Sequence, residues 1–364
     1  MKILHIIDHL SLGGAQTVVK GLIENQKGSN INYLFSLRDS VVPININHKN
    51  VFTCNSRKKY SLKPIRGLEE FIENESVDVL HCHLFRSQFF GWLVKKRYFP
   101  RVKLIFHEHG RIFKDNCIYN LFLKYSTAQT DLYLAVSEAT RNRLIKNTNI
   151  PDSKIKVLYN YVDLNTFSQD KISWNIEAER IKLGINKDDF VAGFAGRIIE
   201  RKGWRTFLGA AEYVLDKHPN TKFLVAGEGQ EKDKLLQLLD HRHLNKNIKY
   251  IGYVSDMVWF YSLLNCFVMP SHWEPMGLTE IEAQAMGVPV ISSNVEALNE
   301  IINDGENGLL FEVKNEKDLA EKIKKLLDSD KNRQELIKGG RETVKNYCLN
   351  KYITSMNLIY EDLF

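Results

Sequence analysis

The segment CFVMPSHWEPMGLTEIEAQAMGVPVISS, residues 266–293, contains one complete strand–helix–strand unit. Its apolar run Cys266–Met269 predicts a buried strand, and Val290–Ser292 predicts a second one. Between them, Gly277–Met286 has the apolar spacing of a helix. Because a crossover helix of this kind joins parallel strands, the segment predicts a parallel α/β layer.

The same alternation extends from this segment toward both ends of the sequence. Further strands are expected at Lys2–Ile7, Asn32–Leu37, Val77–His81, Lys103–His107, Leu132–Val136, Lys156–Tyr159, Phe190–Ala195, Lys222–Ala226, Ile248–Tyr250 and Gly308–Phe311. Helices are expected at Gln16–Gln26, Leu62–Asn74, Ser137–Lys146, Trp204–Lys217, Lys232–Leu239, Lys317–Leu327 and Arg333–Tyr347. The pattern weakens at the polar segment Phe167–Glu179, which we interpret as a linker. The predicted fold class is α/β, with two Rossmann-like, doubly wound domains in tandem.

The composition is that of an ordinary globular protein. At roughly 150 residues per domain, 364 residues correspond to about two domains. A content of 44% hydrophobic and 26% charged residues excludes a wholly disordered or collagen-like chain. Residues 1–168 carry ten more basic than acidic residues, whereas residues 169–364 carry four more acidic than basic ones. We therefore expect the two halves to bind different partners.

The sequence gives no sign of export or of a membrane span. Five cysteines without a C-x-x-C pair argue against a disulfide framework or a zinc site. The apolar run in MKILHIIDHLSLGG, residues 1–14, is too short for a secretory signal. No run approaches the roughly 20 apolar residues that cross a bilayer. We expect a cytoplasmic protein.

Chemically informative residues gather where expected strands end. In residues 271–291, Gly277 and Leu278 open a helix whose free N–H groups and dipole suit an anion. Glu274 precedes that helix, and Glu282 lies within it among apolar residues, where a charge needs a partner. A carboxylate can accept hydrogen bonds from two vicinal hydroxyls, as in ribose recognition. The alternative for Glu282 is a solvated glutamate on an outer helix face.

Two further loops follow strands and open helices. FAGRIIERKG, residues 194–203, places Arg197 and Lys202 where two cations suit a diphosphate, the alternative being an exposed basic loop. Gly13 and Gly14 follow the first strand, where glycines let backbone N–H groups approach a phosphate or sugar, or simply form a tight turn. VAGEGQ, residues 225–230, lacks the third glycine of a dinucleotide fingerprint.

Histidines occur in pairs at two neighbouring strand ends. FHEHG, residues 106–110, contains His107 and His109, which could bond a substrate hydroxyl or stabilise developing charge. The spacing also suits a metal pair, but no third ligand of suitable spacing follows. His81 and His83 repeat the pattern one unit earlier, and we interpret them as structural.

Taken together, these residues resemble the retaining glycosyltransferases of family 4, which have the GT-B fold, and the resemblance covers essentially the whole chain. Glu274 and Glu282, separated by seven residues, match the signature of that family. GRIIERKG matches its Arg and Lys pair, FHEHG its active-site histidine, and Gly13-Gly14 its amino-terminal glycine loop. AVSE, residues 135–138, and LYNYVD, residues 158–163, match its interdomain landmarks.

The resemblance implies transfer of a sugar from a nucleotide diphosphate donor, UDP- or GDP-linked, with retention of configuration. It implies two domains facing across a cleft, with residues 1–168 binding the acceptor and residues 169–348 binding the donor. The helix at about 349–364 is expected to pack back on the first domain.

The resemblance also implies a role for each site residue. Arg197 and Lys202 neutralise the leaving diphosphate, and Gly277 and Leu278 add backbone donors to the same phosphates. Met276 also belongs to the donor-binding residues. Glu282 holds the ribose, Glu274 touches donor sugar hydroxyls, and His109, in preference to His107, contacts the sugar. Gly13, Gly14 and Gln16 form the acceptor-side loop. No cofactor and no metal ion are expected, because cations and a helix end take that role.

The sequence departs from the family pattern on the acceptor side. Gln16 stands where the family often has a glutamate, and Tyr161 replaces a common glycine. The acceptor is therefore left open between lipopolysaccharide core, polyprenyl-linked glycan, capsule precursor and glycolipid.

Basic and aromatic residues in the first half suggest an anionic membrane surface as a further partner. One cluster is FFGWLVKKRYFPR, residues 89–101, with Lys95, Lys96, Arg97 and Arg101. The other comprises Arg57, Lys58, Lys59, Lys63 and Arg66. The alternative for either cluster is a solvated helix face. No nucleic-acid motif is present.

Two other functions remain as alternatives. One is a sugar-nucleotide epimerase or phosphorylase of the same fold, against which the Glu274/Glu282 pair with Arg197 and Lys202 argues. The other is a non-catalytic sugar- or lipid-binding relative. The sequence leaves the oligomeric state open.

Overall fold

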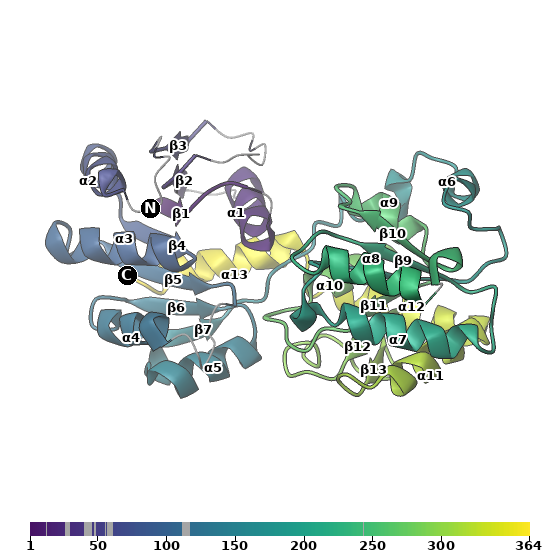
Figure 1. The fold of residues 1–364 in the computed structure, drawn as a ribbon. Helices are drawn as coiled ribbons and strands as arrows, with labels where there is room; N and C mark the ends of the chain where they lie inside the picture. The colour runs from purple at the N-terminus through teal and green to yellow at the C-terminus, as the bar shows by residue number, and fades with distance from the viewer. Residues whose placement is uncertain are drawn as a thin grey trace. The chain divides into compact units, whose positions relative to one another are not determined.

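The chain forms two compact units (Figure 1). A computed structural model describes residues 1–11, 13–25, 30–39, 46, 49–54, 56, 61–110, 117–242 and 244–364. Unit 1 comprises Met1–Tyr161 and Leu349–Phe364, and unit 2 comprises Val162–Cys348. The expected boundary after residue 168 lies slightly later than this one. Val162 belongs to unit 2 because its N–H donates to the carbonyl of Tyr347 at 2.8 Å and it pairs with Cys348.

Unit 1 is built on a parallel sheet whose described strands run in the order β3-β2-β1-β4-β5-β6-β7. These strands are β1 Lys2–Ile7, β2 Ile31–Ser36, β3 Val51–Thr53, β4 Val79–His83, β5 Lys103–Glu108, β6 Leu132–Ala135 and β7 Ile155–Val157. Its helices are α1 Gly14–Asn25, α2 Lys63–Glu75, α3 Phe85–Arg97, α4 Cys117–Ser126, α5 Glu138–Thr148 and α13 Leu349–Glu361. The central strands are almost completely buried, as in any parallel sheet covered on both faces.

Unit 2 repeats this architecture with described strands in the order β10-β9-β8-β11-β12-β13. They are β8 Val191–Ala195, β9 Lys222–Ala226, β10 Ile248–Gly252, β11 Cys266–Met269, β12 Val290–Ser293 and β13 Leu309–Phe311. The helices are α6 Ile176–Lys182, α7 Trp204–Leu215, α8 Lys232–His241, α9 Met257–Ser262, α10 Leu278–Ala285, α11 Glu316–Leu327 and α12 Asp330–Val344. The predicted pair of doubly wound α/β domains is confirmed.

Two elements differ from the sequence prediction in an informative way. The strand expected at Val77–His81 is β4, Val79–His83, because the Asp78 carboxylate accepts the Lys2 N–H at 2.8 Å at its start. This shift brings His83 into the strand. The short edge strand β3 was not predicted, since three partly exposed residues carry no clear apolar period.

Helix α13, drawn in yellow, returns to cover one face of the sheet in unit 1 (Figure 1). Tyr352, Met356 and Tyr360 are buried there against Ile3 of β1 and Ile105 of β5. The Tyr360 hydroxyl also contacts His81 Nδ1 at 2.7 Å. Burial of this apolar face supplies the reason for a segment after unit 2 to rejoin unit 1.

We predict that Tyr360→Ala destabilises unit 1 by about 3–5 kcal/mol, because a fully buried aromatic ring leaves a cavity. Urea unfolding measures the change. The matched control on the same helix is Leu358→Ala, whose side chain is 56% exposed and should change stability by less than about 0.5 kcal/mol. Equal effects of the two substitutions would contradict the packing of α13 on this face.

Candidate functional site

In both units the order of the described strands reverses once, and the predicted site residues lie close to these points. The reversal falls between β1 and β4 in unit 1 and between β8 and β11 in unit 2. Loops leaving the carboxyl ends of the two strands diverge at such a point and open a crevice for ligands.

In unit 2 an ion pair joins the loop after β8 to the loop after β11. Lys202 Nζ lies 2.5 Å from Glu274 Oε1, which also accepts a hydrogen bond of 2.6 Å from Ser271 Oγ. Glu274 is 4% exposed, so this charge is almost fully removed from water. A buried carboxylate requires such partners. The ion pair therefore links two motifs that lie 72 residues apart in the sequence.

Backbone contacts reinforce the same junction. Arg201 donates to the carbonyl of Trp273 at 2.9 Å, and its guanidinium lies 5.1 Å from that indole ring. Gly203 has φ +69°, and a Cβ there would lie 1.8 Å from the carbonyl oxygen of Pro270. Only glycine fits this position, for reasons of both conformation and space.

Helix α10 begins over a buried acid that the sequence analysis did not single out. Glu280 is fully buried, and Ser292 Oγ donates a hydrogen bond to its Oε1. Its Oε2 has no hydrogen-bond partner among the described residues and would lie 1.8 Å from a Cβ on Gly277. Burial, and secondarily the charge of Glu274, raises the pKa of Glu280 to about 8. Glu280 is therefore largely protonated at neutral pH.

The second glutamate of the signature lies further along α10. Glu282 Oε2 accepts a hydrogen bond of 2.9 Å from the Tyr261 hydroxyl, which lies 3.0 Å from the Thr279 carbonyl. Burial raises the pKa of Glu282 to about 7, although the Tyr261 bond opposes this shift. The solvated alternative is wrong, since Glu282 is half-buried and bonded to a buried tyrosine.

A cavity of about 340 Å³ opens at the carboxyl ends of β8, β9 and β10. Its lining is formed by Ala195, Gly196, Arg197, Ala226, Gly227, Glu228, Tyr253, Val254, Met257 and Thr279. Arg197 is exposed at this cavity, while Lys202 packs its side chain near Gly196. Met276 is buried beside the loop, and Gly277 and Leu278 form the start of α10. The predicted residues of unit 2 thus surround one end of its sheet.

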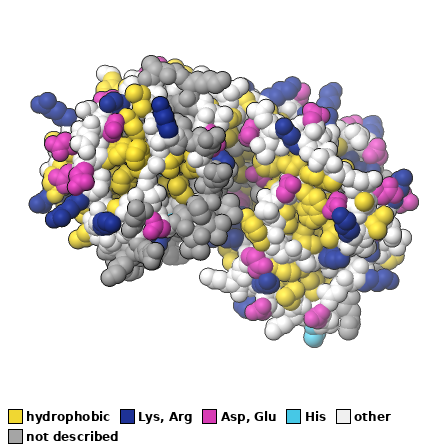
Figure 2. Space-filling view, turned by 90° about the horizontal axis from the view of Figure 1, so that it is seen from above, with side chains coloured by type: hydrophobic (Ala, Val, Ile, Leu, Met, Phe, Trp, Pro, Cys, Tyr) yellow, Lys and Arg dark blue, Asp and Glu magenta, His cyan; other side chains and the backbone are white. Residues whose placement is uncertain are grey.

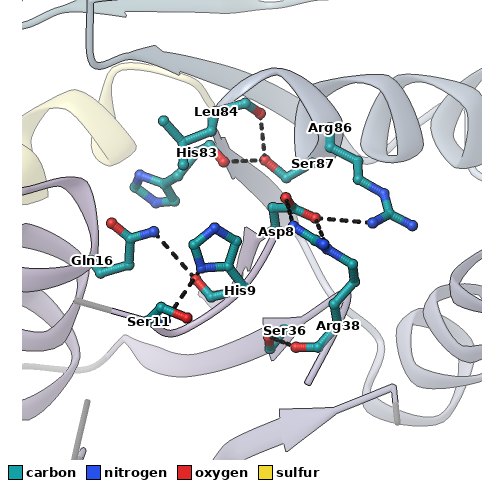
Figure 3. Close-up of polar contacts among 10 residues, drawn as sticks. All are labelled: Asp8, His9, Ser11, Gln16, Ser36, Arg38, His83, Leu84, Arg86 and Ser87. Atoms are coloured by element: carbon teal, nitrogen blue, oxygen red, sulfur yellow. Dashed lines mark hydrogen bonds and ion pairs between the residues drawn. The ribbon is translucent and has the colours of Figure 1, made fainter. Parts of the chain in front are cut away.

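In unit 1 the glycine loop is followed by a buried glutamine (Figure 3). Gln16 Nε2 donates to the carbonyl of His9 at 3.4 Å, and a Cβ on Gly13 would lie 2.5 Å from Gln16 Oε1. Gly14 is the first residue of α1. The loop is therefore closed onto the start of its own helix by a side-chain amide.

Next to this loop, two arginines flank one aspartate (Figure 3). Arg38 binds the Asp8 carboxylate through two bonds of 2.9 and 2.6 Å, and Arg86 Nη1 lies 3.2 Å from Asp8 Oδ1. Arg86 Nη2 is buried without a partner among the described residues. The cluster carries a formal charge of one positive unit at the carboxyl edge of the sheet.

Five histidines lie on one face of the same sheet edge. They are His5, His81, His83, His107 and His109, and all but the half-buried His109 are fully buried. Neighbouring strands align His5 with His81 and His83 with His107, which places them on one face. Burial lowers the pKa of His5 and of His109 to about 4, and it lowers the pKa of the other three well below the usual value. The cluster is uncharged at neutral pH.

The structure supplies the third imidazole that the sequence did not offer beside His107 and His109. One ring nitrogen each of His83, His107 and His109 lies within 4.8 Å of the others, and His5, His81 and His83 form a second such group. The sequence signal for this grouping was the H-x-H pair on each strand, but His5 could be added only from the strand register.

Two families of known proteins match this chain, one in each half of the sequence. The sequence profile of "Glycosyltransferase Family 4" matches residues 12–166, and that of "Glycosyl transferases group 1" matches residues 175–343. The capsular polysaccharide biosynthesis glycosyltransferase CapM of Staphylococcus aureus is 33% identical over 240 residues, covering 64% of this chain and 60% of CapM. The O-antigen biosynthesis glycosyltransferase WclY of Escherichia coli is 26% identical over 372 residues, covering 100% of this chain and 99% of WclY.

The fold comparison agrees. The crystal structure of Anabaena Alr3699/HepE in complex with UDP and glucose superposes with a TM-score of 0.84 over 100% of both chains, at 18% identity. The chain therefore belongs to the family 4 glycosyltransferases with the GT-B fold, and it is a glycosyltransferase.

We predict that Glu280→Gln removes a pH-dependent loss of stability. The folded protein retains the Glu280 proton up to a pH of about 8, whereas the unfolded chain releases it above about 4.5. Stability associated with this group is therefore present below pH 4.5 and lost as the pH rises toward 8. Relative to wild type, the variant should gain roughly 1 kcal/mol per pH unit across this window.

Urea unfolding of both proteins at pH 5, 6, 7 and 8 measures this difference. A difference that stays constant with pH would show that Glu280 is already ionised in the folded protein.

Proposed function

We propose that this glycosyltransferase takes its sugar from a nucleoside diphosphate donor bound by unit 2 and transfers it with retention to a glycan or lipid-linked acceptor of the cell envelope. The observation that carries the proposal is the Lys202–Glu274 junction beside the 340 Å³ cavity. The similarity to CapM and WclY, glycosyltransferases of capsular polysaccharide and O-antigen biosynthesis, supports an envelope acceptor. UDP and glucose in the HepE crystal support the donor class.

The cavity suits a nucleoside and the neighbouring loops suit its diphosphate. Most of the cavity lining is apolar or glycine, which matches a flat base. The Glu282 carboxylate, held by Tyr261, would accept hydrogen bonds from ribose hydroxyls. Arg197, Lys202 and the first turn of α10 would stabilise the negative charge that develops on the leaving diphosphate.

Two further roles complete the proposal. Glu274 holds Lys202 in place and would accept hydrogen bonds from sugar hydroxyls through its carboxylate. His109 of unit 1 would bond a substrate hydroxyl, with Gly13, Gly14 and Gln16 forming the acceptor-side loop. Because cationic side chains and a helix end meet the diphosphate, the proposed reaction uses no metal ion and no cofactor.

The direct test is a screen of UDP- and GDP-sugars for slow donor hydrolysis by the full chain, with and without EDTA. We expect release of one nucleotide, unchanged by EDTA, and NMR should first detect the free sugar with the anomeric configuration of the donor. Addition of the correct acceptor should accelerate nucleotide release, which an epimerase, a phosphorylase or a non-catalytic binder would not show.

We predict that Lys202→Met and Glu282→Gln each lower this turnover by about 100-fold or more. The first removes a positive charge and the second an acceptor oxygen, while both keep the side-chain shape. The matched controls in unit 2 are Lys345→Met and Glu335→Gln, whose side chains are 63% and 62% exposed. Thermal unfolding checks that all four variants fold. Near-normal turnover in both site variants would refute the donor-site assignment.

We also propose that unit 1 contacts an anionic membrane surface through helices α3 and α4. Ile118, Leu121 and Tyr125 are 80%, 68% and 63% exposed on α4. Lys96 of α3 lies beside the last of these, with Nζ 5.1 Å from the Tyr125 ring. Exposed apolar side chains bordered by basic ones suit a lipid headgroup layer.

The structure corrects part of the expected basic cluster. Lys95 is buried and paired with Asp131, so it is not available to a membrane, whereas Lys96, Arg97 and Arg101 are exposed. In the second cluster Lys63 and Arg66 are exposed on α2, and Arg57, Lys58 and Lys59 lie outside the described residues. On the face drawn in Figure 2, the described Lys and Arg side chains lie in separate groups among acidic and hydrophobic ones. No described helix is long and apolar enough to cross a bilayer.

We predict that the protein co-sediments with phosphatidylglycerol vesicles and that Ile118→Ser with Leu121→Ser weakens this binding at least about fivefold, since two apolar anchors are lost. Raising the salt concentration should weaken the remaining electrostatic part. Leu358→Ser, on an exposed residue of α13, is the matched control and should bind as wild type. Absence of binding by the wild-type protein would remove the proposal.

A further inference from the structure

The five histidines are connected by two separate series of hydrogen bonds. In the first, which we call the Asn32 relay, Asn32 Oδ1 contacts His5 Nε2, His5 Nδ1 contacts His83 Nε2, and His83 Nδ1 contacts His109 Nε2. Each of these distances is 3.2 Å. In the second, the Tyr360 relay, Tyr360 Oη contacts His81 Nδ1 at 2.7 Å, and His81 Nε2 contacts His107 Nδ1 at 3.2 Å.

The amide oxygen of Asn32 gives the first relay a direction. That oxygen only accepts hydrogen bonds, so His5 Nε2 must carry the proton. A neutral imidazole has one N–H, which leaves His5 Nδ1 bare, and His83 Nε2 must donate to it. The same reasoning puts the next proton on His109 Nε2 and leaves His109 Nδ1 bare.

The three rings of the Asn32 relay are neutral because they are buried. A protonated imidazole would donate from both nitrogens, and the order of donors would be lost. Burial keeps the pKa of His5 and of His109 at about 4 and that of His83 well below its usual value, so each ring carries a single proton at neutral pH.

The Tyr360 relay has no such fixed end. A tyrosine hydroxyl can donate or accept, so either direction satisfies its contacts with His81 and His107. The two relays therefore differ in whether the order of their protons is fixed, although both are buried at the same edge of the sheet. His81 and His83 stack with ring centres 4.2 Å apart, and both side chains are fully buried.

We propose that Asn32, His5 and His83 are positioning residues that fix His109 in the tautomer protonated on Nε2, so that His109 meets its substrate as a hydrogen-bond acceptor through Nδ1. The inference rests on the proposed function in taking His109 as a substrate contact. His109 Nδ1 is buried and has no partner among the described residues, so its lone pair is available to a hydroxyl donor once substrate binds. A tautomer with the proton on Nδ1 could neither accept that bond nor take up a proton there.

The hydrogen bonds also argue against a metal ion at the grouped nitrogens. A three-histidine metal site needs three lone pairs directed at one centre. In the Asn32 relay, His83 uses one nitrogen as a donor to His5 and the other as an acceptor from His109. Its lone pair is therefore already engaged.

The first experiment reads the tautomer without reference to activity. Protein labelled with 15N at histidine reports which ring nitrogen is protonated from its chemical shift. We expect wild-type His109 to show a bare Nδ1 and a protonated Nε2 at pH 7.5. A proton on Nδ1, or a charged ring, would overturn the inference.

The decisive substitutions are His83→Asn and His83→Leu, which have nearly the same shape. The asparagine oxygen can take the place of Nδ1 and accept the His109 Nε2–H, whereas leucine cannot. We expect His83→Asn to retain the wild-type tautomer and a kcat within about threefold of wild type. We expect His83→Leu to give mixed His109 tautomers and a kcat at least about tenfold lower with KM little changed, because a wrong tautomer removes the reactive lone pair.

The equally buried neighbour supplies the control. His81→Leu breaks the Tyr360 relay and should leave the His109 tautomer unchanged. If His83→Asn and His83→Leu behave alike in both tautomer and kcat, or if His81→Leu alters the tautomer as strongly as His83→Leu, the inference is overturned. A stoichiometric shift of the His83, His107 and His109 signals on adding ZnCl₂ would show that these histidines bind a metal ion, and it would likewise overturn the inference.

The failure of this inference can be told from failure of the proposed function. Should His109→Ala transfer sugar at the wild-type rate while the wild-type 15N spectrum shows the expected tautomer, the role of His109 in catalysis falls and the tautomer assignment stands. Mixed tautomers in wild-type protein with normal activity would overturn the assignment and leave the donor site unaffected.

Discussion

The ion pair between Lys202 and Glu274 ties together the two loops on which the proposed donor site of unit 2 depends. One loop leaves the carboxyl end of β8 and the other that of β11, and the strand order of the sheet reverses between these two strands. Without the pair, a buried carboxylate would lose its charged partner, at a cost of several kcal/mol. The same contact sets the distance between the basic loop and the start of α10. The pair therefore stabilises unit 2 and, under the proposed function, also holds in place two of the loops that would meet the donor.

The two units differ in electrostatics at equivalent places in their sheets: unit 2 has charged side chains there, and unit 1 has neutral histidines. In unit 2 the charged side chains of Lys202 and Glu274 form an ion pair. The nearby Glu280 is kept neutral by burial. Unit 1 presents five uncharged imidazoles, because burial disfavours their protonation. A charged site suits the recognition of a diphosphate. A neutral one suits hydroxyl groups, whose hydrogen bonds depend on where each single proton lies.

Site residues could be predicted from the sequence where they lie close together within one segment. The Glu274/Glu282 spacing, the Arg197 and Lys202 loop and the H-x-H pairs could all be found because each lies within one segment. The apolar periods likewise predicted most strands, including Lys2–Ile7, Lys222–Ala226 and Cys266–Met269 with their observed bounds.

Residues that act through strand register or distant contacts were not predictable in this way. His5 reaches the histidine cluster only because β1 lies beside β4, and Asp8 meets Arg38 and Arg86 from two other elements. Glu280 is a charged residue type that is usually exposed, and only the tertiary structure shows that it is buried beside Gly277.

The return of α13 to unit 1 has a consequence for synthesis on the ribosome. Residues 1–161 emerge first, but the surface that Tyr360 and Met356 cover remains open until α13 has left the exit tunnel. Unit 2, which is continuous in sequence, can complete its core before unit 1 does. The amino-terminal unit is thus begun first and finished last, and its apolar sheet face needs protection during the interval in which the rest of the polypeptide is made.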